Sequence, residues 1–173
     1  MTPQLHPDPA PHAGLSLSDD EKNRRYHEIA AQIASVLENE SHLITRMATI
    51  TCLLAHGFET YFWTGFYMVD PQKPQELVVG PYQGTLGCLR IPFGKGVCGR
   101  AASEERTQIV EDVDAFPGHI ACDQRSRSEI VVPVFDAEHK LIAVFDVDSE
   151  QLGTFDETDR TWLEQIIAQI FAR

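Results

Sequence analysis

The sequence predicts an α+β domain with a central, largely antiparallel β-sheet. Helix-period apolar runs lie at both ends of the chain, and strand-like runs that include a β-hairpin lie between them. We expect the N- and C-terminal helices to pack on one face of the sheet, and loops that carry reactive side chains to cover the other. With 173 residues and 43% hydrophobic content, the chain can bury the core of one domain.

The chain begins with a segment of different composition. Residues 1–17 are rich in Pro and His and lack periodicity, which is typical of a flexible tail. We therefore predict a flexible tail at 1–17, to which we assign no role, and a single domain at 18–173.

Three helices are predicted outside the strand region. Ser18 and Glu21 fit a capping box at the start of the first helix, and Ser41 is expected to cap a second helix that ends near Gly57. The third helix covers residues 156–173. Its apolar residues share one face: Trp162, Leu163, Ile166, Ile167, Ile170 and Phe171.

Four strand-like runs follow the second helix, with a short helix among them. They are YFWTGFYMVD, ELVVG, TQIVED and the hairpin EIVVPVFDAEHKLIAVFDVD. The GKGVCG segment at 94–99 is interpreted as a turn, because it lacks the strand-to-helix context of a nucleotide-binding motif.

The hairpin carries a group of carboxylates. Alternate residues of a strand share a face, so Asp146 and Asp148 point the same way as Val144. A turn centred at 137–138 would place Glu129 opposite Asp146. An odd-length loop or a bulge would change this register, whereas the shared face is the firmer prediction.

These acids are interpreted as a functional group rather than as a solvated polar face. The strand that Glu129 opens is apolar on both faces, and three cysteines lie nearby in the sequence. Like charges a few ångströms apart resist joint ionisation, so one carboxyl is expected to keep its proton and act as a general acid. The other carboxylates would suit the ammonium group of an amino-acid ligand.

Cysteines supply the second reactive group. Cys88, Cys98 and Cys122 lie in Gly-, Pro- and Arg-rich segments that are predicted to be loops, where reactive groups tend to sit. Cys52 lies in the apolar second helix and is predicted to be a packing residue.

The charged neighbours of Cys122 bear on its reactivity. Arg125, Arg127 and His119 would favour its thiolate form, unless the arginines pair instead with acids such as Asp123. His119 is either a base for this thiol or a simple hydrogen-bonding side chain.

A zinc site is the competing interpretation of the cysteines. Cys88, Cys98, His119 and Cys122 offer enough ligands, but the cysteines are ten and twenty-four positions apart and form no CxxC pair. We therefore expect no metal.

Trp63 and Tyr67 share a strand face with Tyr61 and Gly65. These aromatic side chains suit either the wall of an apolar pocket or ordinary core packing, and the pattern alone favours packing.

The overall charge argues against a nucleic-acid partner, and the hydropathy argues against a membrane span. A net charge of −12 and a pI near 4.9 argue against a nucleic-acid surface. No apolar run reaches the roughly 18 residues of a membrane span, and the N-terminus lacks the regions of a signal peptide. We expect a cytoplasmic protein, in which the cysteines are thiols, metal ligands or a transient catalytic disulfide.

Three long segments resemble one family. They are GPYQGTLGCLRIPFGKGVCGRAA, DVDAFPGHIACDQRSRSEIVVPV and AVFDVDS, and they are similar to segments of the free methionine-(R)-sulfoxide reductases, which are single GAF domains. The resemblance covers about residue 26 to the C-terminus and is specific, because these segments include the unusual set of cysteines.

The resemblance implies roles for individual residues. Cys122 would be the nucleophile, Cys88 the resolving cysteine, and Cys98 an additional cysteine for disulfide exchange. Trp63 and Tyr67 would enclose the methyl and thioether end of the substrate. The active-site acids of the family correspond to three residues of the hairpin: Glu129, Asp146 and Asp148.

The resemblance also implies a reaction. The protein would reduce free methionine (R)-sulfoxide through sulfenic acid and disulfide intermediates, and a thioredoxin-like dithiol would recycle it without any cofactor. Pairing of two chains into a homodimer is suggested by analogy alone. The rivals from other classes are a GAF sensor of a small ligand and a redox sensor that oxidises without turnover.

Overall fold

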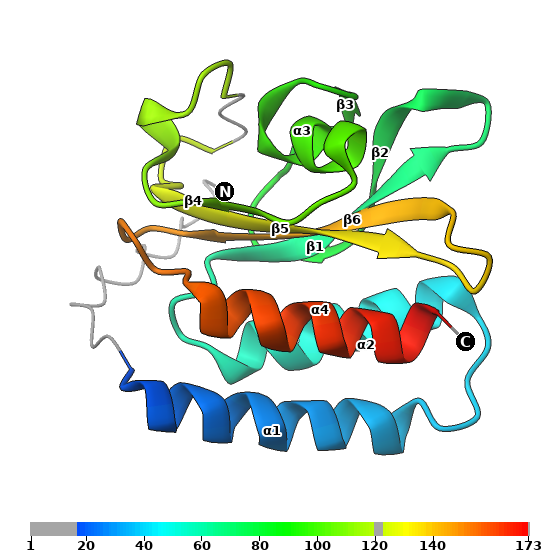
Figure 1. The fold of residues 1–173 in the computed structure, drawn as a ribbon, viewed down its shortest axis with the longest axis vertical. Coiled ribbons are helices and arrows are strands. Elements are labelled where there is room, and N and C mark those ends of the chain that lie inside the picture. Colours follow the sequence, from blue (N-terminus) through cyan, green and yellow to red (C-terminus); the bar gives the residue numbers. More distant parts are fainter. Residues whose placement is uncertain (1–16, 120–122, 173) are drawn as a thin grey trace, which may run out of the picture.

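The predicted α+β architecture is confirmed by a computed structural model, which describes residues 17–119 and 123–172. Six antiparallel strands form one sheet in the order β3-β2-β1-β6-β5-β4 (Figure 1). In chain order the elements are α1 (Asp19–Val36), α2 (Leu43–Gly57), β1 (Trp63–Asp70), β2 (Lys73–Gln83), β3 (Arg90–Pro92), α3 (Gly96–Glu104), β4 (Gln108–Val110), a 3-10 turn (Val113–Ala115), β5 (Ser128–Phe135), β6 (Leu141–Ser149) and α4 (Glu157–Phe171).

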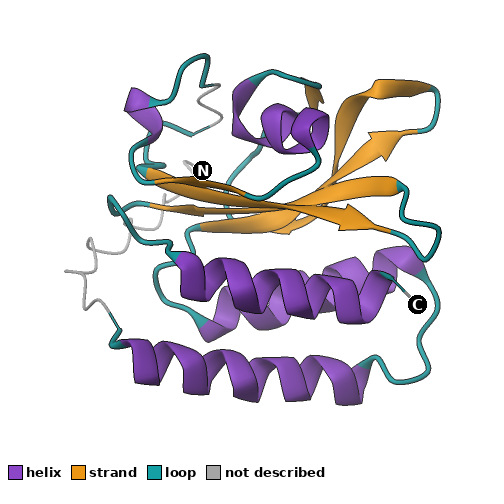
Figure 2. Ribbon diagram, viewed as in Figure 1, coloured by secondary structure: helices purple, strands orange, loops and turns teal. Residues whose placement is uncertain are grey.

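The helices form two layers beneath the sheet. Helices α2 and α4 cover one face, and α1 packs against these two helices on the side away from the sheet (Figure 2). Helix α3 and the chain around β3 cover the opposite face. None of the helices in the described ranges is long and apolar enough to cross a membrane.

Helix caps fix where the helices start. The capping box of Ser18 and Glu21 is confirmed at α1, and Asp156 caps α4. The predicted cap Ser41 is wrong: the ring of His42 accepts the N–H of Thr45 and caps α2 instead. Leu17 already packs partly buried against the core, while the rest of the predicted tail lies outside the described residues.

The sheet separates two apolar clusters, because alternate strand residues face opposite sides. Phe145 and Val147 of β6 face the helices, whereas Val144 faces α3. The prediction that Tyr61 shares a face with Trp63 and Tyr67 is wrong, because Tyr61 belongs to the cluster on the helix side of the sheet. Tyr61 precedes β1, where the strict alternation of a strand does not apply.

Cys52 does not pack in the core. It lies on the exposed side of α2, and its sulfur is 3.8 Å from Nδ1 of His56, one helical turn later. The predicted packing role is wrong because the apolar residues of α2 outnumber those that one helix face can bury.

The GKGVCG segment is not a plain turn. Strand β3 precedes it and α3 starts at Gly96, whose φ of +60° favours glycine. A Cβ at Gly99 would lie 2.3 Å from the carbonyl oxygen of Pro92, so this position must lack a side chain. Helix α3 therefore lies tight against the end of β3, and Cys98 is a buried residue of its first turn rather than a loop residue.

The hairpin register differs from the prediction by two residues. Glu129 lies opposite Asp148, and Asp146 lies opposite Val131. The turn contains three residues, 137–139, with His139 at a φ of +60°, and a bulge follows between Val134 and Phe135. A shift of two residues keeps every side chain on its face, so the predicted common face of the acids is confirmed.

A buried polar network holds α1 onto α4. The carboxylate of Asp159 accepts hydrogen bonds from Lys22 Nζ and from the Tyr26 hydroxyl, both at 2.7 Å. Tyr26 also shares a hydrogen bond with Tyr61. Each group here is shielded from water, so each depends on the others for its partner.

Replacement of Asp159 by Ala should lower the free energy of unfolding by about 3–5 kcal/mol, because it leaves the charge of Lys22 buried without its main partner. Urea denaturation measures this loss. The matched control is Glu157→Ala, an exposed acid of the same helical turn, which should cost less than about 1 kcal/mol. Equal losses in the two variants would show that the network does not hold α1.

Candidate active site

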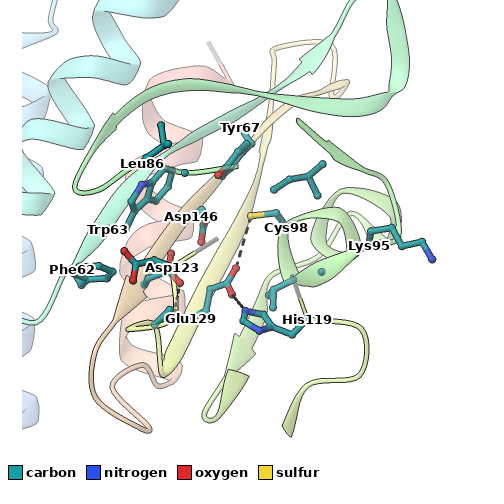
Figure 3. A pocket seen from close by; sticks show the side chains of 16 residues that line it. Phe62, Trp63, Tyr67, Leu86, Lys95, Cys98, His119, Asp123, Glu129 and Asp146 are labelled. Atoms are coloured by element: carbon teal, nitrogen blue, oxygen red, sulfur yellow. Dashed lines mark hydrogen bonds and ion pairs between the residues drawn. The ribbon is translucent and has the colours of Figure 1, made fainter. Parts of the chain in front are cut away.

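A cavity lies on the face of the sheet opposite α2 and α4 (Figure 3). Strands β1, β5 and β6 form its floor, the first turn of α3 forms one wall, and loop residues that include Leu86, His119 and Asp123 form the rim. The empty space, mouth included, is about 520 Å³. A recess lined by aromatic side chains and a few convergent polar groups is typical of a site for one small molecule.

The three predicted carboxylates lie together on the cavity floor. Glu129 comes from β5, and Asp146 and Asp148 come from β6. Glu129 and Asp146 are each only 5% exposed. Within the described residues, Oδ1 of Asp146 is buried without a hydrogen-bond partner, which leaves an acceptor open toward a ligand.

Burial raises the pKa of all three carboxyls. For Glu129 and Asp146 burial is the largest cause and repulsion between the acids adds to it, so each pKa lies well above its usual range. Burial raises the pKa of Asp148 to about 6, although a hydrogen bond from the Ser126 hydroxyl opposes the shift. These shifts favour the protonated forms of Glu129 and Asp146, while Asp148, with a pKa of about 6, is mostly charged near neutral pH.

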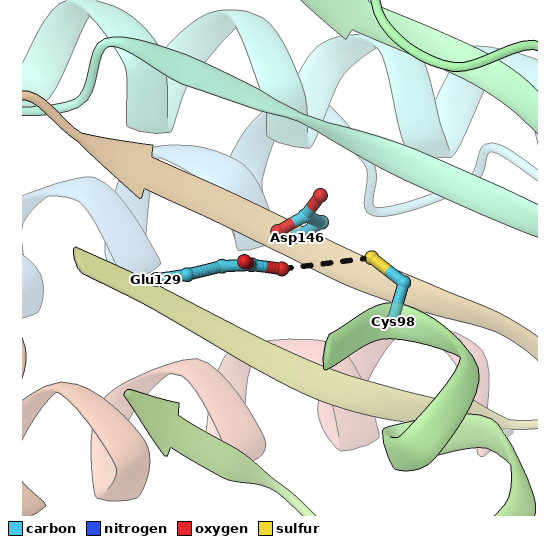
Figure 4. A group of neighbouring side chains, drawn as sticks. All are labelled: Cys98, Glu129 and Asp146. Carbon is cyan, nitrogen blue, oxygen red and sulfur yellow. Dashed lines mark hydrogen bonds between the residues drawn. The ribbon is translucent and has the colours of Figure 1, made fainter. Parts of the chain in front are cut away.

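Cys98 faces these acids from α3 (Figure 4). Its thiol lies 3.9 Å from Oε1 of Glu129, to which it can donate. Burial, followed by repulsion from Asp146 and Glu129, raises the pKa of Cys98 well above its usual range. Cys98 is therefore a protonated thiol and a poor nucleophile in this arrangement.

The same cluster is the group of possible metal ligands in the described part of the chain. One ligand atom each from Cys98, Glu129 and Asp146 lies within 4.8 Å of the others. This is not the zinc set considered from the sequence, since Cys88 is disulfide-bonded and Cys122 lies outside the described residues. The raised pKa values indicate a cluster that shares protons, which suits acid catalysis.

His119 lies at the edge of the cluster. Its Nε2 is 3.9 Å from Oε2 of Glu129, and burial lowers the pKa of the ring. A neutral ring beside a protonated carboxyl offers one more site for the shared proton.

Aromatic side chains form the apolar wall of the cavity. The rings of Trp63 and Tyr67 stack with their centroids 5.5 Å apart, and Tyr82 stacks on the other side of Trp63 at 5.2 Å. Trp63 and Tyr67 thus belong both to the core and to the pocket, so the two interpretations of the sequence do not exclude each other.

Polar contacts hold the loop at 84–89 over this wall. Trp63 Nε1 donates to the carbonyl oxygen of Thr85 at 3.0 Å, and the Thr85 hydroxyl donates to Asp123 at 2.7 Å. Asp123 also pairs with Arg125, which stacks over the ring of Phe62. The arginine therefore pairs with the aspartate that the sequence offered as an alternative partner.

The other cysteines occupy different positions. Cys88 is a partly buried residue of the loop that joins β2 to β3, as predicted, and it is disulfide-bonded. The predicted nucleophile Cys122 lies outside the described residues. Cys52 is on α2 and far from the cavity lining.

Several lining residues were missed from the sequence. Ser126, Phe62 and Lys95 line the cavity, and Thr85 holds its loop. Each is a common residue type in an irregular segment with no periodicity to mark it, so only the Arg- and Ser-rich composition around residue 126 was a signal.

Known proteins have similar sequences and the same fold. A sequence model of the GAF domain matches residues 41–171. The chain is 37% identical to the free methionine-R-sulfoxide reductase of Escherichia coli, over 86% of this chain and 88% of that protein. The corresponding Saccharomyces cerevisiae protein is 35% identical over 91% and 89%. A structure of the Neisseria meningitidis enzyme with its substrate superposes with a TM-score of 0.83 at 46% identity, covering 92% of this chain and 93% of that one.

The titration of Asp148 tests this electrostatic arrangement. The chemical shift of its carboxyl carbon, followed by NMR, should change with a midpoint near pH 6, because burial raises the pKa of this carboxyl above its usual value. Ser126→Ala should move the midpoint upward, since the lost hydrogen bond favours the charged form. A midpoint for Asp148 near 4 would contradict the arrangement.

Proposed function

The chain belongs to the GAF domain family and is an oxidoreductase of its free methionine-R-sulfoxide reductase group, and we propose that it reduces free methionine (R)-sulfoxide to methionine with its own thiols. One observation carries the proposal: two buried carboxyls whose raised pKa values favour the protonated form share an enclosed cavity with an aromatic wall. A sulfoxide needs both, because its oxygen leaves only when protonated and its methyl group is apolar.

The first step joins the acid and the nucleophile. Glu129 or Asp146 donates a proton to the sulfoxide oxygen while the thiolate of Cys122 attacks the sulfur. The S–S bond formed by this attack and the S–O bond of the substrate then break as the hydroxyl moves to the Cys122 sulfur, which leaves Cys122 as a sulfenic acid and methionine as the thioether. Correctly placed acid catalysis contributes roughly 10²- to 10⁴-fold to such a step.

The second step restores the thiol. Cys88 condenses with the sulfenic acid of Cys122, so that a disulfide forms and water leaves. The disulfide-bonded state of Cys88 supports this resolving role. An external dithiol, of the thioredoxin type, then reduces the disulfide and is itself oxidised. Cys98 faces the same cavity, but its raised pKa disfavours the thiolate that exchange needs, so it would join only as a secondary thiol.

The pocket would select the free amino acid. Asp148, mostly charged near neutral pH, provides a partner for the ammonium group, while Trp63 and Tyr67 would enclose the methyl and thioether end. A methionine sulfoxide residue within a peptide has an amide in place of the ammonium, which would leave the buried charge unpaired.

The nucleophile is tested by replacing Cys122 with Ser. The wild-type protein should release methionine from free methionine (R)-sulfoxide with dithiothreitol, and Cys122→Ser should release none. Cys52→Ser, at the exposed cysteine of α2, is the matched control and should keep full activity. Turnover that survives in Cys122→Ser would remove the nucleophile, and a wild-type protein without turnover would favour a sensor.

Glu129→Gln and Asp146→Asn should each slow reduction by about 10²-fold or more, because each removes a proton donor from the cavity. The fold should persist, since the amides are isosteric and carry no buried charge; circular dichroism and thermal unfolding check this. Asp136→Asn, in the exposed hairpin turn, is the control. Wild-type rates in both cavity variants would show that the carboxyls are not the acid.

A further inference from the structure

Two exposed leucines flank the disulfide-bonded Cys88. Leu86 is 75% exposed and Leu89 is 67% exposed, more than any of the other large apolar side chains that are exposed in the described chain. Cys88 itself is partly buried between them. Exposed apolar side chains of this size on the loop that carries a reactive group are typical of a surface that meets a partner.

The fold keeps these leucines at the surface. The backbone of Leu89 is fixed to the sheet edge, because its carbonyl oxygen accepts the N–H of Val79 at 3.1 Å. Thr85 is held by Trp63 and by Asp123. Between them, a Cβ at Gly87 would lie 2.8 Å from the Tyr67 hydroxyl, so the loop is already seated on the aromatic wall. The loop is therefore held at Thr85, Gly87 and Leu89 while the side chains of both leucines stay exposed.

We propose that Leu86, Cys88 and Leu89 form the docking surface for a protein dithiol that reduces the disulfide of this enzyme. The need for a reductant rests on the proposed function. The surface points to a protein because a small thiol requires no apolar contact area, whereas a folded partner must hold its own thiolate against one sulfur. The chain carries a net charge of −12, and an apolar contact allows a partner to bind without depending on the charge of that partner.

The exchange balances in two steps. A thiolate of the partner attacks the sulfur of Cys88, which forms a mixed disulfide and releases the thiolate of Cys122. The second thiol of the partner attacks its own sulfur in the mixed disulfide and releases Cys88. The partner loses two electrons as it becomes a disulfide, and the two thiolates of the enzyme take up protons.

The test uses a thioredoxin whose second active-site cysteine is replaced by Ser, so that the mixed disulfide accumulates. Non-reducing electrophoresis measures its rate of formation with the oxidised enzyme. Leu89→Asn should lower this rate by about tenfold, since a leucine side chain is no longer buried. Reduction of the same disulfide by dithiothreitol should be unchanged. Leu152→Asn, at an exposed leucine of a separate cavity beside Lys22, is the matched control.

Three results would overturn the docking surface: equal rates in wild type and Leu89→Asn, an equal loss in Leu152→Asn, or an equal loss with dithiothreitol. If Leu89→Asn folds poorly, Leu89→Ser provides the same test. Its rate of disulfide reduction by thioredoxin is then divided by its rate with dithiothreitol, and this ratio is compared with that of the wild type. The proposed function fails separately, when wild type forms the mixed disulfide but releases no methionine from the sulfoxide.

Discussion

The burial of three carboxyl groups on one face of the sheet governs the chemistry of this protein. In water these acids would be charged at neutral pH. In the cavity, loss of hydration and mutual repulsion hold the pKa values of Glu129 and Asp146 well above their usual range. The protein thus favours the protonated form of these two carboxyls in a cavity with an aromatic wall.

The sheet makes such an arrangement possible. Strand alternation sends Phe145 and Val147 into the helix-side core while Asp146 and Asp148 face the cavity. The apolar burial on one face offsets the cost of burying acids on the other. The polar network of Asp159 then ties the outer helix to the same layer, so the floor of the cavity is backed by two layers of helices.

Periodicity predicted the fold and the common face of the acids, because both follow from local spacing. It did not predict the hairpin register, which depends on the three-residue turn and the bulge beside Phe135. It placed a short helix among the strands but not in GKGVCG, where three glycines suggested a turn; Gly96 instead starts α3, and Gly99 allows its close packing on Pro92. The predicted roles of the cysteines came from resemblance, and the burial of Cys98 and exposure of Cys52 depend on tertiary packing that spacing does not encode.

Depth in the cavity separates the acids into two roles. Asp148 lies nearer the surface, and the Ser126 hydroxyl favours its charged form, so it ionises first. Once charged, it repels a second charge on Asp146 and Glu129 and so keeps their protons in place. A charged acid for a ligand cation and protonated acids for a leaving oxygen can therefore coexist within one strand pair. The same carboxyl chemistry can serve different roles through differences in burial and hydrogen bonding.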